Sequence, residues 1–168
     1  MACKPDLAPT PRKPLLDLSR ICGVLVRLDV EGEKFLFLQL GADGSIQRLG
    51  TTEREILRGT ASPELFERVI QEVTPQLLRW KGQCWSDPAP KGKICLLVVG
   101  FQEIDGQEIL MRWQYGSESH EPPPEILEFV ISAVEATNPW LGEQKLRNRN
   151  QKTPPRKNGW HLIPLLQA

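Results

Sequence analysis

Two regions of alternating apolar and polar residues, each bent by a glycine-containing turn, constrain the fold of this chain most strongly. In the first region, apolar residues recur at every second position from Val24 to Val30, which is the period of a half-buried β-strand. Glu31-Gly32-Glu33 turns the chain into a second strand over 34–40, and residues 41–44 turn it into a short third strand over 45–49. Turns this short join antiparallel neighbours, so the sequence predicts a meander.

An amphipathic helix is predicted after this meander. Ser62-Pro63-Glu64 is typical of a helix start, because serine caps the helix, proline suits its first position and a carboxylate favours its positive end. Apolar residues from Leu65 to Val73 fall on one face of this helix. Thr74-Pro75 either ends the helix or begins a second short one that runs through Leu78.

The same order recurs in the second half of the chain. Residues 94–101 are apolar on both faces, as expected for a strand near the centre of a sheet. Asp105-Gly106 predicts a turn, and apolar residues alternate along the return strand from Ile109 to Tyr115. Pro124-Glu125 begins a helix that we expect to end near Asn138-Pro139.

The resemblance between the two halves predicts the fold class. The turn residues Gly32 and Gly106 and the helix starts at Pro63 and Pro124 occupy matching places. This matching favours a diverged ββ(β)α duplication, with pseudo-repeats at about 15–75 and 76–141, although any two hairpin–helix units share these features. Either reading predicts an α+β two-layer sandwich, in which two helices cover one face of an antiparallel sheet of five to six strands.

The 168 residues suit a single domain with terminal extensions. Four prolines in residues 1–14 indicate a flexible N-terminal arm, and residues 15–141 carry the α+β pattern. Residues 142–158 are basic and polar, and we expect an extended linker there. Residues 159–168 are mostly apolar, and we expect this C-terminal segment, which includes Trp160, to dock on its own sheet edge or on a partner or second copy.

No motif for catalysis or for a cofactor is present. The four cysteines form no CxxC pair and the chain has only two histidines, so the sequence predicts no metal site and no cofactor. The one candidate catalytic histidine is His120, which follows Ser119 and precedes Glu121 in a polar stretch. A polar loop explains this cluster more simply than a catalytic centre does, and we therefore expect a protein that is not an enzyme.

Basic and aromatic residues leave nucleic-acid binding open as an alternative. Arg79, Trp80, Lys81 and Trp85 interleave charge with rings on which bases could stack. A basic tail contributes Lys145, Arg147, Arg149, Lys152, Arg156 and Lys157. Lysine plus arginine and aspartate plus glutamate both number 21, however, and binding along a phosphate backbone usually goes with a basic excess.

Taken together, these features favour a soluble protein–protein interaction module that acts through its sheet surface or edge and its terminal arms. A protein partner or self-association is expected. The alternatives are single-stranded nucleic-acid binding and small-molecule binding between sheet and helices. No segment resembles a signal peptide or a membrane span, so we expect the cytoplasm and no membrane.

Overall fold

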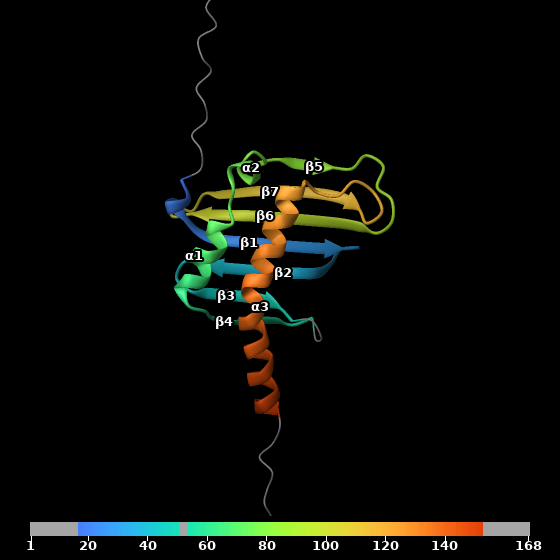
Figure 1. Ribbon diagram of the computed structural model, residues 1–168. Helices are drawn as coiled ribbons and strands as arrows, with labels where there is room; N and C mark the ends of the chain where they lie inside the picture. The colour runs from blue at the N-terminus through green and yellow to red at the C-terminus, as the bar shows by residue number, and fades with distance from the viewer. Residues whose placement is uncertain (1–16, 51–53, 153–168) are drawn as a thin grey trace, which may run out of the picture.

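The computed structural model describes residues 17–50 and 54–152, which form one sheet and the helices packed on it (Figure 1). The sheet has seven strands in the order β4-β3-β2-β1-β6-β7-β5. A short 3-10 helix, η1 (Leu18–Arg20), precedes the first strand. The strands are β1 (Ile21–Val30), β2 (Glu33–Gly41), β3 (Ser45–Leu49), β4 (Ile56–Thr60), β5 (Cys84–Ser86), β6 (Ile94–Glu103) and β7 (Glu108–Gly116).

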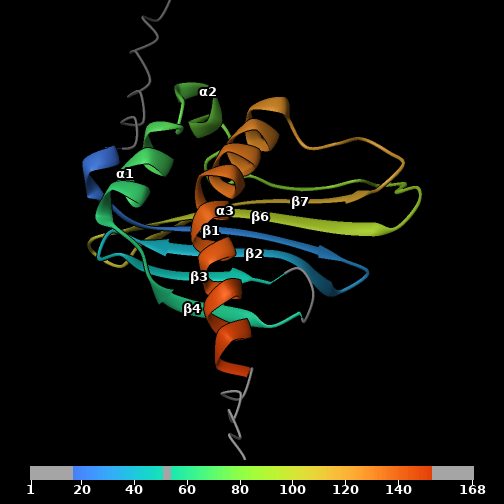
Figure 2. The same cartoon turned by 60° about the horizontal axis from the view of Figure 1, so that its bottom comes forward.

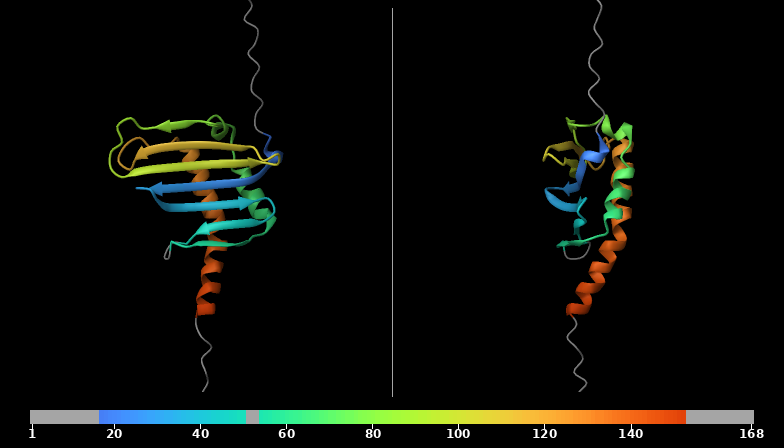
Figure 3. Two further views of the ribbon diagram at one scale, coloured as in Figure 1. Left: turned by 180° about the vertical axis from the view of Figure 1, so that it is seen from behind. Right: turned by 90° about the vertical axis from the view of Figure 1, so that its left-hand side faces the viewer.

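The three α-helices all lie on the same face of the sheet (Figure 2). They are α1 (Pro63–Gln71), α2 (Pro75–Leu78) and α3 (Pro124–Lys152). The long helix α3 crosses the strands from the β7 side to the β4 side and extends past that edge (Figures 1 and 3). Seen edge-on in Figure 3, the helices form one layer and the strands the other.

The alternating residues of the strands and the apolar faces of the helices form the core between these layers. Trp113 is 2% exposed, and Val26, Met111 and Ile126 are fully buried in the same cluster. The rings of Phe101 and Phe129 join β6 to α3 edge to face, with centroids 5.5 Å apart. Successive side chains of a strand point to opposite faces of the sheet. Because the helices pack on one face, the inward-pointing side chains are buried there and the other face carries no helix.

The α+β class is confirmed, and the size and type of the sheet are corrected. The sheet has seven strands instead of five or six, and it is mixed, because β5 pairs in parallel with β7. The two missed strands are edge strands of five and three residues, β4 and β5. β4 carries Gly59 between two polar residues and β5 has only three residues, so neither shows the repeated alternation on which recognition from sequence depends.

The end of the last helix is also corrected, because α3 continues through Pro139 to Lys152. Proline removes one backbone donor and bends a helix without always ending it, and Figure 3 shows α3 bent along its length. The next residue anchors the helix: the Trp140 indole N–H donates to the Thr60 carbonyl at 2.9 Å. Gly59 makes room for this indole, since a Cβ at Gly59 would lie 3.0 Å from the ring.

The hairpins β1–β2 and β6–β7 lie side by side in the sheet, because β1 of one pairs with β6 of the other. A duplicated hairpin would give this order, and the duplication itself stays a prediction. Residues 142–152 of the expected linker are helical, and the arm over 1–14 and the segment over 159–168 lie outside the described residues. None of the described helices is both long and apolar enough to cross a bilayer.

Candidate interaction surface

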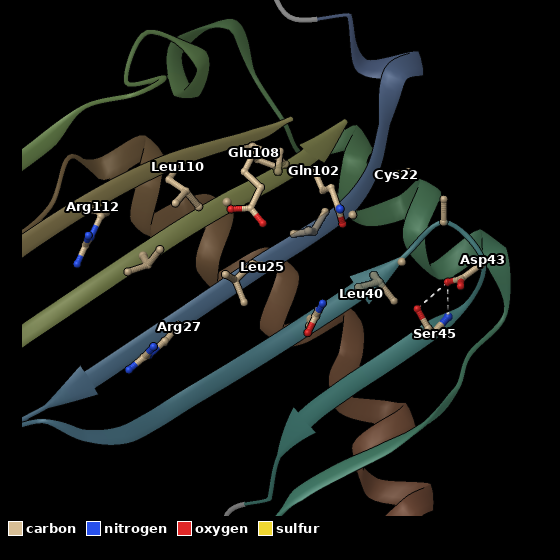
Figure 4. Close-up of a pocket in the computed structure, with 18 of the residues that line it drawn as sticks. Cys22, Leu25, Arg27, Leu40, Asp43, Ser45, Gln102, Glu108, Leu110 and Arg112 are labelled. Carbon is tan, nitrogen blue, oxygen red and sulfur yellow. Dashed lines mark hydrogen bonds between the residues drawn. The ribbon is translucent and has the colours of Figure 1, made fainter. Parts of the chain in front are cut away.

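The face of the sheet opposite the helices carries a broad hollow, which we call the open-face hollow (Figure 4). Its volume is about 890 Å³, and its lining comes mainly from β1, β2, β6 and β7. No described element covers this face in the views of Figure 3. The hollow is therefore a feature of the described chain that is shaped to receive another molecule.

The floor of the hollow is apolar, and a glycine shapes it. The sheet register aligns Leu25 of β1, Gly100 of β6 and Leu110 of β7 in one row across three strands. A Cβ at Gly100 would lie 2.8 Å from Leu110 Cδ2 and 3.5 Å from Leu25 Cβ. The two leucines thus close over β6 where it has no side chain, and Val98 and Leu96 continue the apolar surface along β6.

One end of the hollow is basic. Arg27 and Arg112 flank Val98 in the next row of the register, and Figure 4 shows both side chains at the same end. Arg27 donates to Asp29, and this hydrogen bond raises the pKa of the Arg27 guanidinium. Arg112 makes no ion pair with another described residue, so its charge is available to a bound group.

The opposite end of the hollow is acidic, with Glu108 beside Gln102 and Asp43 farther along, on the β2–β3 turn (Figure 4). The Asp43 carboxylate accepts from the Ser45 hydroxyl at 2.6 Å and from the Ser45 backbone N–H at 2.9 Å. These bonds lower the pKa of Asp43, so it stays charged at neutral pH. The hollow therefore combines an apolar floor with opposite charges at its two ends.

Trp80, which we predicted as a binding residue, is a packing residue in the fold. Its indole N–H donates to Glu125 Oε1 at 2.9 Å, and its ring meets the Trp113 ring edge to face with centroids 6.0 Å apart. The Trp80 bond lowers the pKa of Glu125 and ties the end of α2 to the start of α3. Arg79 and Lys81 are exposed beside it.

The structure does not bring the two predicted basic groups together. Trp85 lies on β5 and is 38% exposed, at one edge of the sheet. Lys145, Arg147, Arg149 and Lys152 lie on the part of α3 that extends past the other edge, at β4 (Figure 1). Arg156, Lys157 and Trp160 lie outside the described residues. A single nucleic-acid track through both groups would have to cross the whole sheet.

The predicted candidate His120 lies on an exposed loop together with Ser119 and near Asp87. His120 is exposed, and the Ser119 hydroxyl donates to the Gly116 carbonyl and accepts from the Gly116 N–H. The nearby Asp87 carboxylate is bound by the Ala89 N–H at 3.0 Å. No group of three or more potential metal ligands occurs in residues 17–50 and 54–152.

The Asp87 carboxylate gives the loop a measurable pH dependence. The Ser119 hydroxyl, the Ala89 N–H and the charge of His120 lower the pKa of Asp87 below its usual 3.8. A carboxylate whose pKa is lower in the folded than in the unfolded state stabilises the folded protein at pH values above the unfolded-state pKa. This stabilisation is lost as the pH falls through the folded-state pKa. We expect Asp87→Asn to lower the free energy of unfolding at pH 7, and we expect this deficit to shrink as the pH falls below 3.8, measured by urea unfolding. Glu118→Gln, which removes an exposed carboxylate from the same loop, is the control, and a constant Asp87→Asn deficit across this pH range would contradict the assignment.

Sequence reasoning missed the open-face hollow because its residues occupy the outward positions of the predicted strands. The available signals were apolar residues at outward positions, such as Leu25 in the first strand and Leu110 in the last, and the strand over 94–101 that is apolar on both faces. The contribution of Gly100 and Leu110 depends on the pairing of β1, β6 and β7, which local periodicity does not specify.

Comparison with known proteins adds no relative to this description. No protein-family model matches the chain, and no curated protein matches it.

Proposed function

We propose that this protein is a protein–protein interaction module whose open-face hollow binds an apolar segment of a partner protein. The observation that carries the proposal is the row of Leu25, Gly100 and Leu110 on a sheet face that no described element covers. Leu110 is 36% exposed at this row. Each large apolar side chain of a partner that is fully buried there would contribute about 1.5–3 kcal/mol.

The charges of the hollow define the chemistry of the partner segment. An acidic side chain at one end of the segment would meet Arg112, and a basic side chain at the other end would meet Glu108 or Asp43. Such complementarity fixes the direction in which a segment lies more than it adds affinity. The partner is therefore an apolar segment with an acidic flank and a basic flank.

The face of the sheet is better suited to this role than its edges. The edge strands β4 and β5 have only five and three residues, so they offer few free backbone groups to an added strand. We include a reducing compartment such as the cytoplasm in the proposal, because Cys22, Cys84 and Cys95 are free thiols.

The test is to select peptides from a display library on the folded protein and to compare their affinities for variants. We expect the selected peptides to carry apolar side chains between an acidic and a basic flank. Leu110→Asp should weaken their binding by at least about tenfold, because it places a charge in the apolar row and removes contacts worth about 1.5–3 kcal/mol. Ile104→Asp is the matched control, since Ile104 is 69% exposed next to the β6–β7 turn and does not line the hollow.

A second pair of variants tests the charges. Arg112→Glu should weaken the binding of the same peptides and reverse the preference for an acidic flank. Arg68→Glu, at an exposed position of α1, should do neither. Equal binding to the wild type and Leu110→Asp would refute the proposal, as would selection of no apolar peptide. Binding of single-stranded oligonucleotides that is lost in Trp85→Ala, with no such peptides, would favour the nucleic-acid alternative instead.

A further inference from the structure

A second cavity, which we call the Arg48 cavity, lies on the helix side of the sheet and is separate from the open-face hollow. Its volume is about 670 Å³, and it lies between α3 and the end of the sheet where β1 ends and β2 begins. Val134, Asn138 and Leu141 line it from α3, and Arg48 lines it from β3. The cavity shares no lining residue with the open-face hollow.

Arg48 occupies a core position of β3. It pairs with Leu38 of β2 and Leu57 of β4 across the sheet, and it is only 3% exposed. The inward period of β3 that buries Ile46 thus also buries a guanidinium group. Burial lowers the pKa of Arg48, yet an arginine remains protonated at neutral pH.

The buried Arg48 guanidinium makes no ion pair with a described residue. Nη2 donates to the Asn138 side-chain oxygen at 2.8 Å, while Nε and Nη1 are buried and have no hydrogen-bond partner in residues 17–50 and 54–152. An arginine has five N–H donors, and the three carried by Nε and Nη1 are unmet among the described residues. A buried cation with neither a counter-charge nor a full set of acceptors is strongly unfavourable, and an anion in the cavity would supply both.

The other charges around the cavity also favour an anion. Lys34, Lys93 and Arg54 line it together with Arg48, against only two acidic residues. Both acids are already engaged: Glu33 pairs with Arg54, and the Glu31 carboxylate accepts from the Ile94 backbone N–H. Lys93 makes no ion pair with a described residue.

We propose that the Arg48 cavity binds an oxyanion, the phosphate or carboxylate group of a small ligand, with Arg48 as its buried anchor and Lys93 as a second cation. The inference is independent of the proposed function, because it concerns another face of the sheet and a different chemical class of ligand. Binding at this site also stabilises the fold, since the anion engages only the folded chain.

The test measures thermal unfolding and binding with inorganic phosphate and with acetate, each against sodium chloride at equal ionic strength. We expect phosphate, acetate or both to raise the Tm of the wild type by about 5 °C at a tenfold excess over Kd. Calorimetric titration should give one site per chain. A stronger effect of phosphate would identify a phosphate ligand, and an equal or stronger effect of acetate a carboxylate ligand.

Arg48→Met keeps most of the side-chain volume and should abolish the shift, whereas Arg58→Met, at an exposed position of the adjacent strand, should retain it. If Arg48→Met does not fold, the Arg48 Nε–H resonance of the wild type carries the test and should move on titration with the same anion. Equal Tm values in all three salts would overturn the proposal. So would an anion response that Arg48→Met retains, or an Nε–H resonance that does not move.

Discussion

Replacement of Trp113 by alanine should lower the free energy of unfolding by about 3–5 kcal/mol, the usual loss for a large aromatic residue in a core. Trp113 is 2% exposed in the middle of β7, and its ring contacts Trp80, which in turn is bound to Glu125 of α3. Its removal would leave a cavity between the sheet and two helices. Urea unfolding followed by circular dichroism measures the loss without relying on tryptophan fluorescence.

Trp85→Ala is the matched control, because Trp85 is the direct partner of Trp113 across the β5–β7 pair. It is 38% exposed at the edge of the sheet, so its removal should cost less than about 1 kcal/mol. Two equal losses would contradict the core position of Trp113. The circular dichroism spectra of both variants without urea should match that of the wild type, which shows that both variants are folded before unfolding is measured.

Gly116→Ala should be destabilising by about 3 kcal/mol, because the added methyl group would collide with backbone atoms. A Cβ at Gly116 would lie 2.0 Å from the Lys91 carbonyl oxygen and 2.4 Å from the Lys91 nitrogen. The adjacent chain is held in place, since Ser117 N–H donates to Lys93 and Glu118 N–H donates to Lys91. The loop before β6 would therefore have to move away from the end of β7.

Gly142→Ala makes the same chemical change where nothing stands in the way. Apart from its chain neighbours and the adjacent backbone of α3, no described atom lies within 4 Å of a Cβ at Gly142. Alanine there should stabilise the protein by about 0.5–1 kcal/mol, because glycine loses more backbone entropy in a helix. Opposite signs for the two variants are expected in urea unfolding, and a tolerated Gly116→Ala would show that the loop gives way.

The same distinction between local pattern and tertiary contact separates what could be predicted about the fold from what could not. The strands over 24–30 and 109–115 follow from alternation, because each buries one face and the period of a strand is two. Pro139 shows the limit of local rules. We predicted that the helix ends there, but the Trp140 indole bonded to Thr60 lies immediately beyond it, and the helix continues to Lys152.

The candidate sites depend still more on tertiary contacts. Trp80 and Trp85 attracted attention as neighbours in the sequence, yet one is a packing residue tied to Glu125 and the other lies on an edge strand. The sequence alone did not show which face of its strand carries Arg48. The register of the sheet places it between Leu38 and Leu57, on the buried face. Its unmet donors have no signature in the sequence.

By itself the sequence determined the α+β class, the two long hairpins and the helix starts at Pro63 and Pro124. These features follow from periodicity and capping, which act between residues a few positions apart. Only the tertiary structure decided the pairing of β1 with β6, the short edge strands, the open-face hollow and the isolation of Arg48. The physical reason is that these features arise where distant segments meet, and their energies come from contacts that no local stretch of the chain contains.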